Sequence, residues 1–375
     1  MALVKPDSSR IAKIKVVSVG GGGGNAIAHM IQESKIEGVE FIAINTDAQV
    51  LLDNPADTKL QIGEKLTRGL GVGGNPQIGT QAAEESREKI KELLVDSDMV
   101  FITAGMGGGT GTGASPIVAE LAKESGALTI AIVTKPFLFE GARRTVLADD
   151  GINKLKDNVD ALIVIPNQRL MDVIDRKVTL VDAFKIADGV LAQGVQGVSE
   201  IITTPGLINV DFADVRTIMK DAGSALLGIG TGIGENRAQM AARAAISSPL
   251  LEISIEGAKG LLFNIVGGND MTMTEVDEAA RIISDTADPD ANIIFGATID
   301  AKMTEQMRIT VIATGFDEMR ARLGRLVAPG LGEFNSIPQT AFSQPVRRDP
   351  QPVIQPLQAP QPQVQSQTQV ASDPV

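Results

Sequence analysis

The chain has 375 residues, no cysteine and a formal net charge of −12 at pH 7. The lack of cysteine argues against a secreted disulfide framework, and no uncharged apolar run is long enough to cross a membrane, so direct membrane insertion is not expected. The acidic balance disfavours nonspecific binding to nucleic acid, and no nucleic-acid partner is expected. Composition therefore indicates a cytoplasmic globular protein.

Apolar runs alternate with amphipathic stretches from residue 14 onward. The alternation predicts strands at 14–19, 39–44, 99–103, 128–133 and 161–165, with helices between them. This order is typical of an α/β fold with a doubly wound parallel sheet. In such sheets ligands bind at the carboxyl ends of the strands, where the glycine-rich segments of this chain also lie.

Three glycine-rich segments, at 20–24, 69–74 and 105–113, are expected to converge on one pocket. The last precedes a predicted helix at 114–123, so its glycines occupy a strand-to-helix turn. Helix N-termini present free N–H groups and a positive dipole end to anions. No lysine follows these glycines, which excludes the P-loop pattern GxxxxGK[ST]; backbone and a metal ion must therefore neutralise most of the phosphate charge.

A dinucleotide-binding Rossmann site is an alternative for the first glycine segment, because Asp47 ends the next strand about where such folds keep their ribose-binding acid. However, Asn25 occupies the place of the third glycine in a GxGxxG that begins at Gly20. A dehydrogenase also leaves the other two glycine segments unexplained. A triphosphate explains three loops better than a diphosphate does, so an NAD-binding oxidoreductase is a remote alternative.

Apolar residues recur at steps of three and four from Leu180 to Ile202. This spacing predicts one long helix, which the sequence Thr-Pro-Gly at 204–206 ends. From Leu180 to Thr203 the helix would be roughly 36 Å long at 1.5 Å per residue.

A smaller unit follows from Ala225, with strands near 226–230, 261–266, 293–296 and 309–313 and helices at 237–246 and 275–286. Thr272 and Thr274 are candidate caps of the second of these helices. Met271 and Met273 are expected to pack in the core. After residue 316, a helical turn through 326 precedes a Pro- and Gln-rich stretch, which is predicted to be disordered.

Six motifs, in order along the chain, resemble those of the FtsZ family, the bacterial tubulin-like cell-division GTPases. The resemblance extends over about residues 11–316 and implies a GTP-binding domain, a long central helix and a second α/β domain with a mixed sheet. The motifs are Val19–Ala26, Asn45–Gln49, Gly69–Pro76, Gly107–Gly113, Thr134–Phe137 with Phe139–Gly141, and Asn209–Asp214.

The resemblance and the element pattern together predict six regions. These are a flexible N-terminus at 1–10, a GTP-binding domain at 11–178, the central helix at 179–205, a synergy loop and its following helix at 206–224, a C-terminal activation domain at 225–316, and a disordered tail at 317–375. FtsZ proteins usually end in a short apolar-basic peptide that docks on membrane-tethering adaptors. Residues 366–375 contain no evident equivalent, so an assembling FtsZ paralogue without adaptor attachment is the alternative.

The resemblance implies that GTP and GDP bind with magnesium, which is held chiefly through the nucleotide and not by dedicated protein ligands. Phe184 would stack on the base, and Asp188, one turn on, can accept two N–H donors from guanine that adenine lacks. Glu140 and Arg144 can be read as a helix i,i+4 pair worth ~0.3–0.5 kcal/mol, and by resemblance they contact the ribose and phosphate side. The full implied set is Gly21, Gly22, Gly23, Gly24, Asn25, Gly71, Gly73, Gly74, Gly108, Gly109, Thr110, Gly111, Thr112, Glu140, Arg144, Asn167, Phe184 and Asp188.

Asn209, Asp211 and Asp214 can have a purely structural role, since Asn and Asp side chains commonly cap loops and the starts of helices. They lie beyond the far end of the roughly 36 Å helix from Phe184, so they must act on a neighbour's nucleotide. The resemblance implies a head-to-tail homopolymer whose active site closes between subunits, with Asp211 and Asp214 polarising the attacking water and helping to hold a cation. By resemblance, such filaments form the cytokinetic ring at midcell and bind other cell-division proteins.

Overall fold

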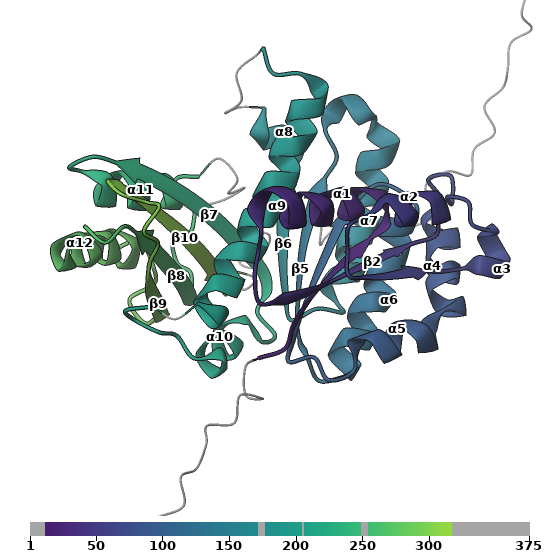
Figure 1. The fold of residues 1–375 in the computed structure, drawn as a ribbon, viewed down its shortest axis with the longest axis horizontal. Coiled ribbons are helices and arrows are strands. Elements are labelled where there is room, and N and C mark those ends of the chain that lie inside the picture. The colour runs from purple at the N-terminus through teal and green to yellow at the C-terminus, as the bar shows by residue number, and fades with distance from the viewer. Residues whose placement is uncertain (1–11, 172–176, 205, 249–253, 317–375) are drawn as a thin grey trace, which may run out of the picture. The chain divides into compact units, whose positions relative to one another are not determined.

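The computed structural model describes residues 12–171, 177–204, 206–248 and 254–316. Ten strands form one mixed sheet in the order β3-β2-β1-β4-β5-β6-β7-β10-β8-β9 (Figure 1). The strands from β3 to β7 are parallel, whereas β10 runs antiparallel to both of its neighbours. The predicted α/β architecture with a parallel first sheet and a mixed second part is confirmed.

The strands of the first half occur where buried apolar runs predict them. They are β1 (Ile14–Val19), β2 (Val39–Asn45), β4 (Met99–Gly105), β5 (Leu128–Lys135) and β6 (Ala161–Pro166). Helices cover both faces of these strands, which therefore need apolar residues at nearly every position. The edge strand β3 (Thr58–Gln61) was not predicted, because it is short and three of its four residues are polar.

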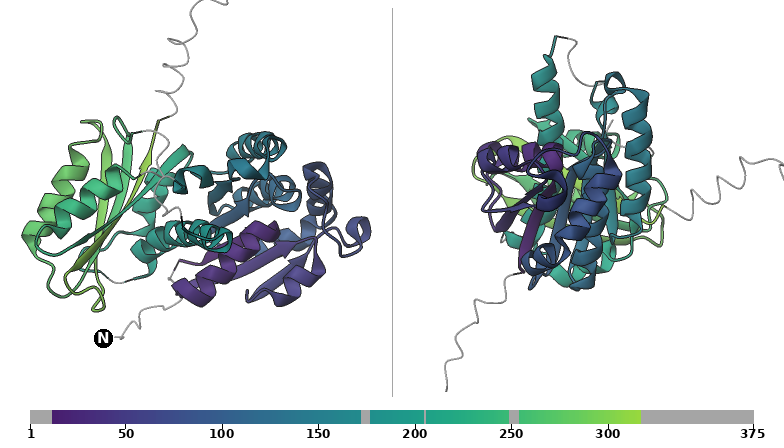
Figure 2. Two further views of the ribbon diagram at one scale, coloured as in Figure 1. Left: turned by 90° about the horizontal axis from the view of Figure 1, so that it is seen from above. Right: turned by 90° about the vertical axis from the view of Figure 1, so that its right-hand side faces the viewer.

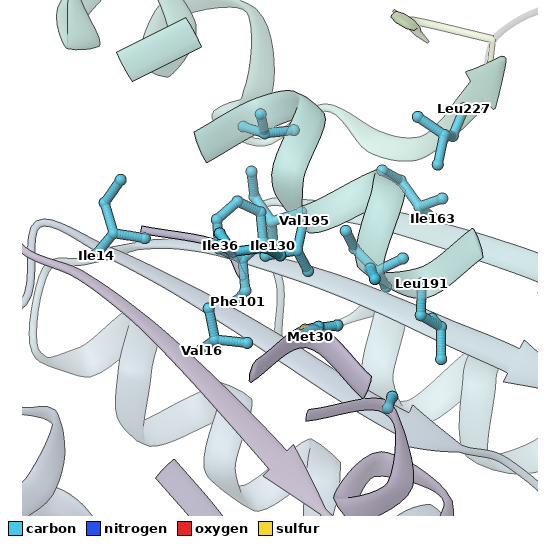
Figure 3. Close-up of a cluster of buried hydrophobic side chains, with 14 of the residues drawn as sticks. Ile14, Val16, Met30, Ile36, Phe101, Ile130, Ile163, Leu191, Val195 and Leu227 are labelled. Carbon is cyan, nitrogen blue, oxygen red and sulfur yellow. The ribbon is translucent and has the colours of Figure 1, made fainter. Parts of the chain in front are cut away.

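One face of this part of the sheet is covered by α1 (Gly20–His29), η2 (Met30–Ser34), α2 (Ala48–Asp53) and α9 (Leu180–Thr203), with α10 (Phe212–Met219) following α9. Figure 3 shows part of the core beneath them, where Val16 and Phe101 of the sheet meet Met30, Leu191 and Val195. The same cluster extends to Leu262 and Ile312 of the second half. A single apolar core therefore joins the two halves on this face.

The other face is covered by α4 (Pro76–Glu85), α5 (Arg87–Leu94), α6 (Thr110–Glu124) and α7 (Ala142–Lys156), which pack on a second apolar cluster. Three short helices, α3 (Glu64–Thr67), η3 (Leu138–Glu140) and α8 (Asn167–Leu170), lie in the connections. The helices η3 and α8 directly follow the carboxyl ends of β5 and β6, where a ligand site is expected.

The predicted long helix is α9, whose 24 residues begin after a side-chain cap from Thr179. Glycines on α9 allow close contact with both halves of the sheet: a Cβ at Gly194 would lie 3.3 Å from Ile132 of the first half and 3.0 Å from Leu227 of the second, and Gly197 packs against Thr310. The carboxylate of Glu200 lies 3.0 Å from the guanidinium of Arg308. The helix therefore lies between the two halves and contacts both (Figure 2).

The second half contains β7 (Gly223–Ile233), β8 (Gly260–Gly267), β9 (Asn292–Ile299) and β10 (Gln306–Thr314), with α11 (Arg237–Ile246) and α12 (Met273–Ser284) on one face. The first three residues of β7 pair with β6, so the sheet continues through the predicted domain boundary. The predicted boundaries stay predictions. The N-terminus at 1–10 and the tail at 317–375 lie outside the described residues, and within the described ones no helix is long and apolar enough to span a bilayer.

The start of α12 distinguishes the two candidate caps. Thr272 accepts from the N–H of Glu275, and Glu275 accepts from the N–H of Thr272, which is a capping box. Thr274 lies inside the first turn and is not the cap. The expectation that Met273 packs in the core is wrong, because its side chain is 80% exposed, whereas Met271 does pack against the second-half core.

Candidate functional site

The three glycine-rich segments meet around the first turn of α6. A Cβ added to Gly20 would lie 2.7 Å from the backbone nitrogen of Gly111, which leaves no room for a side chain. A Cβ added to Gly109 would press on Val72 and lie 3.0 Å from the backbone nitrogen of Asn75. The three segments are therefore in contact, whereas their convergence on one pocket stays a prediction.

The helix α6 begins at Thr110, four residues before the predicted start at 114. Gly111 packs on the backbone of β4 and Gly113 on that of α4, and these tertiary contacts outweigh the weak helix propensity of Gly and Thr. Neither α1 nor α6 has a side-chain hydrogen bond at its N-cap. The N–H groups of both first turns are therefore left for an anion.

Two glycines in these segments are not required by the packing of the protein itself. A Cβ at Gly21 or Gly108 would meet nothing within 4 Å, and neither residue has the positive φ that excludes side chains. Gly23 and Gly24, by contrast, are buried against Thr103 and Asn54. Gly21 and Gly108 are thus the positions where the missing side chain leaves room for a ligand.

Two threonines brace the segment at 107–112. The hydroxyl of Thr110 lies 2.9 Å from that of Thr46, and the hydroxyl of Thr112 accepts from the N–H of Gly107 at 2.9 Å. Both Thr110 and Thr112 are buried. Thr46 belongs to a motif that the sequence singled out, but its contact with Thr110 joins segments 64 residues apart and has no local signal.

A cavity of about 120 Å³ lies beside these turns, between α1, η3, α8 and α9. It brings together seven residues that the sequence assigned to nucleotide binding: Gly22, Asn25, Glu140, Arg144, Asn167, Phe184 and Asp188. Sequence reasoning did not assign five further lining residues. Thr134 and Pro136 could have been found, because they lie at the carboxyl end of β5. Gly105 and Met106 could also have been found, because they begin the glycine-rich segment at the carboxyl end of β4, whereas Ala187 carries no such signal.

The aromatic and polar groups of this cavity suit a nucleobase. Phe184 is 38% exposed and meets the buried ring of Phe137 edge to face at 5.4 Å. Asn167 is only 4% exposed, and its Oδ1 has no hydrogen-bond partner within the described part of the chain. Burial raises the pKa of Asp188, one turn after Phe184, to about 7. A base with adjacent N–H donors would satisfy both oxygens.

Glu140 and Arg144 form the ion pair that their spacing allows, with 2.6 Å between guanidinium and carboxylate. Glu140 also accepts from the N–H of Phe137 at 2.8 Å, which closes the turn of η3. Both residues line the cavity as well. The ion-pair interpretation is therefore correct, and it is compatible with a ligand-binding role.

The segment at 69–74 contacts the glycine-rich turn before α6, because a Cβ at Gly109 would press on Val72. Gly73 and Gly74 have φ angles of 59° and 74°, which side chains rarely adopt, and Asn75 caps α4. Gly71 lies near the carboxylate of Asp47. None of the three glycines lines the 120 Å³ cavity, so a ligand would reach them only through an extended phosphate chain.

Asp47 does not serve the role that a Rossmann site would require. Its carboxylate accepts from the N–H groups of Gln49 and Val50 at 3.0 and 3.2 Å and so caps α2. Asp47 is also absent from the cavity lining. These contacts give the Rossmann alternative no support.

The predicted catalytic residues lie apart from this site and are exposed: Asn209 precedes α10, Asp211 is its N-cap residue, and Asp214 lies in its first turn. Asn209 accepts from the N–H of Gly206 at 2.6 Å, and Asp214 accepts from that of Asp211 at 3.4 Å. The capping explanation is therefore correct for this chain alone. These residues follow the C-terminus of α9, whereas Phe184 and Asp188 lie in its first turns, so the fold does not bring the two groups together.

No cluster of three or more histidine, aspartate or glutamate side chains suited to a metal ion occurs among the described residues. The two uncapped helix N-termini and the lysine-free turns fit a phosphate chain that carries its own cation. Magnesium held through the nucleotide stays a prediction.

Comparisons with known proteins agree with this geometry. The profile of the Tubulin/FtsZ family, GTPase domain, matches residues 13–175, and that of the FtsZ family, C-terminal domain, matches residues 223–317. An empty FtsZ dimer structure from M. jannaschii is 49% identical, with a TM-score of 0.79 over 83% of this chain and 90% of that one. A second M. jannaschii FtsZ structure, of a point mutant, is 50% identical with a TM-score of 0.78 over 82% and 92%. CetZ2 from Haloferax volcanii, in a GTPγS-bound protofilament, shares the fold at 20% identity and a TM-score of 0.68 over 84% and 97%.

Proposed function

Because this chain belongs to the FtsZ family of tubulin-like GTPases, we propose that it hydrolyses GTP with magnesium in head-to-tail filaments, in active sites completed between subunits. One observation carries the choice of base. The Asn167 oxygen, which has no hydrogen-bond partner among the residues that the structure describes, and the Asp188 carboxylate line the same cavity as Phe184. Guanine offers adjacent N–H donors to these oxygens, and adenine does not. The cavity lies beside two helix N-termini that can take the phosphates.

The shared active site is supported by the position of the exposed carboxylates. Asp211 and Asp214 follow the far end of α9, about 36 Å of helix from the base-binding end, so they reach only the nucleotide of another subunit. In the neighbour's site they orient and polarise the attacking water, as general bases do in hydrolysis. Magnesium bound with the phosphates supplies the positive charge that the lysine-free turns lack.

Exposed apolar side chains lie near both halves of the proposed shared site, where they can contact a neighbouring subunit. Leu70, in the segment that contacts the phosphate-binding turn, is 69% exposed, and Leu207, beside Asn209, is 71% exposed. Two different surfaces that meet head to tail make a heterologous contact, which repeats into a filament. We propose that these filaments form the cytokinetic ring in the cytoplasm at the division site, with membrane-tethering adaptors among the partners.

Hydrolysis of GTP with magnesium is the first expected result. Turnover of ATP should be at least about 100-fold lower, because adenine leaves the polar groups of the base cavity unpaired. Excess chelator should abolish turnover, and sedimentation should detect polymer with GTP but not with GDP, ATP or NAD. Phosphate release from the full chain measures turnover, and pelleting measures polymer formation. Equal turnover of ATP, or undiminished turnover in chelator, contradicts the proposal, and specific NAD binding would favour the oxidoreductase alternative.

The affinity for GTP should fall as the pH is lowered from 8 to 6. Guanine N–H groups donate to the ionised Asp188, whose pKa in the free protein is about 7. With this pKa the ionised fraction of Asp188 falls about tenfold between pH 8 and pH 6, so the association constant should fall by the same factor over that range. Titrations of wild type and Asp188→Asn measure it, since the variant keeps an oxygen acceptor but does not titrate. Protonation of the nucleotide itself affects both proteins equally, so it cancels in the ratio of their two affinities at each pH. If the affinities of wild type and Asp188→Asn changed with pH in the same way, Asp188 would not bind the base as an anion.

A further inference from the structure

A larger cavity, of about 620 Å³, lies on the opposite side of α6 from β4, between α4, α6 and α7. We call it the rear cavity. Its lining includes Gly74 and Thr112, the start of α4 from Asn75 to Thr80, and later turns of α6 and α7 as far as Asn158. A nucleotide in the 120 Å³ cavity would not occupy the rear cavity, because no residue lines both cavities.

The rear cavity results from the way in which three helices pack. Gly113 lets α6 approach α4 so closely that a Cβ there would lie 2.8 Å from the nitrogen of Thr80, and Gly151 gives α7 the same closeness to α6 near Thr112. Beyond these contacts, the facing residues Ile117 and Leu147 line the space instead of filling it. The cavity is therefore a consequence of the glycines that position the phosphate-binding turn.

The lining combines an apolar surface with one uncompensated cation. Pro116, Ile117 and Leu147 supply the apolar part. Lys154 is paired with Asp150 at 3.2 Å, whereas Arg143 makes no hydrogen bond or ion pair within the described residues. A volume of several hundred Å³, mainly apolar walls and a few polar groups are the usual properties of small-molecule sites.

We propose that the rear cavity is a binding site for a small organic monoanion with an apolar body. Its carboxylate pairs with Arg143, and its body packs on Pro116, Ile117 and Leu147. One negative charge is the complement of the lining, because Lys154 and Asp150 neutralise each other. A dianion would leave one charge unpaired, and a neutral ligand would leave Arg143 unpaired.

A ligand in the rear cavity would contact the backs of two segments that the proposed function uses, Gly74–Asn75 and Thr112–Gly113. If those segments bind phosphates, the site is coupled to the nucleotide site: a monoanion that favours one arrangement of the segments changes the affinity for GTP, and GTP changes the affinity for the monoanion by the same factor. This coupling rests on the proposed function, whereas the binding site itself does not.

Binding of 2-naphthoate tests the site without any nucleotide. Amide chemical shifts of the full ¹⁵N-labelled chain should change near Gly113 and Gly151, with a dissociation constant on the order of 1 mM or tighter for a ligand of this size. The neutral 2-naphthamide should bind at least tenfold more weakly, and so should 2-naphthoate to Arg143→Glu. The matched control is Arg243→Glu, which reverses an exposed arginine on α11 and should leave binding unchanged.

Several results would overturn the proposal. One is that chemical shifts change only at residues away from the rear cavity. Another is that 2-naphthamide binds as tightly as 2-naphthoate, and a third is that 2-naphthoate binds Arg143→Glu as tightly as wild type. A melting curve verifies that Arg143→Glu is folded. In a second measurement, saturating 2-naphthoate should change the affinity for GTP at least twofold in wild type and not in Arg143→Glu. An unchanged affinity would overturn the coupling. A chain that binds 2-naphthoate but no GTP at all would contradict the proposed function and leave the binding site standing.

Discussion

A Gly108→Ala variant is expected to lose GTP affinity by at least about 100-fold while its melting temperature stays at or above that of wild type; such a loss is about 2.7 kcal/mol of binding free energy. The physical reason is that a Cβ at Gly108 meets no protein atom within 4 Å. The methyl group would instead occupy the space that a phosphate chain needs at the turn before α6. Alanine at a compatible position stabilises the folded state by about 0.4–1 kcal/mol, since it restricts the unfolded chain.

Nucleotide titration and thermal unfolding of the same samples measure the two effects. Gly21→Ala should behave in the same way, because its Cβ is equally free. Gly126→Ala is the reverse control: it lies at the end of α6 with a φ of 86°, so it should lower stability by about 1–2 kcal/mol and leave GTP affinity unchanged. Wild-type affinity in Gly108→Ala would show that no phosphate approaches this turn.

Mixing Asp214→Ala with Gly108→Ala is expected to restore GTP hydrolysis that neither protein has alone. Asp214→Ala should bind GTP normally yet hydrolyse it about 100-fold more slowly or worse, because the missing carboxylate belongs to the neighbour's site. Gly108→Ala lacks the nucleotide but keeps Asp214. In an equimolar filament, an intact pocket faces an intact Asp214 at roughly a quarter of the interfaces, by the geometry of heterologous contacts. Turnover near a quarter of the wild-type rate is therefore expected.

Two controls separate catalysis from capping. Asp214→Asn keeps an oxygen acceptor for the N–H of Asp211 but no charge, so it should be as inactive as Asp214→Ala. Asp288→Ala removes a half-buried aspartate of the second half that accepts from the N–H of Asp290, and it should hydrolyse GTP at the wild-type rate. Sedimentation must detect co-assembly of the mixed variants. If they co-assemble and turnover equals the sum of the separate proteins, the active site is not shared between subunits.

Much of the fold could be predicted because its signals are local. The strands β1, β2, β4, β5 and β6 are apolar at nearly every position, and their predicted bounds differ from the structure by two residues at most. The helix α9 has the predicted bounds, since its apolar spacing at steps of three and four and the breaker sequence at 204–206 are both local signals. The cap of α12 at Thr272 is equally local.

Other features depend on contacts between distant segments, and local patterns predicted them poorly. The edge strand β3 exists because it pairs with Ile42–Asn45, not because its own four residues favour a strand. The early start of α6 depends on the close packing of Gly111 and Gly113 on β4 and α4. Met273 is apolar by sequence, yet its place at the first turn of α12 exposes it.

The same distinction applies to the candidate site. The sequence by itself determined which residues can do the chemistry: glycines at strand ends for phosphates, Phe184 and Asp188 one turn apart for a base, and carboxylates beyond the far end of α9. Tertiary structure alone decided that Ala187 joins the 120 Å³ cavity, that burial raises the pKa of Asp188, and that Arg143 lines a mainly apolar cavity without a hydrogen-bond or ion-pair partner among the described residues. Residue type and short-range spacing specify chemical capacity and local conformation, whereas burial and cavities arise only when long-range pairing of strands and helices brings distant residues into contact.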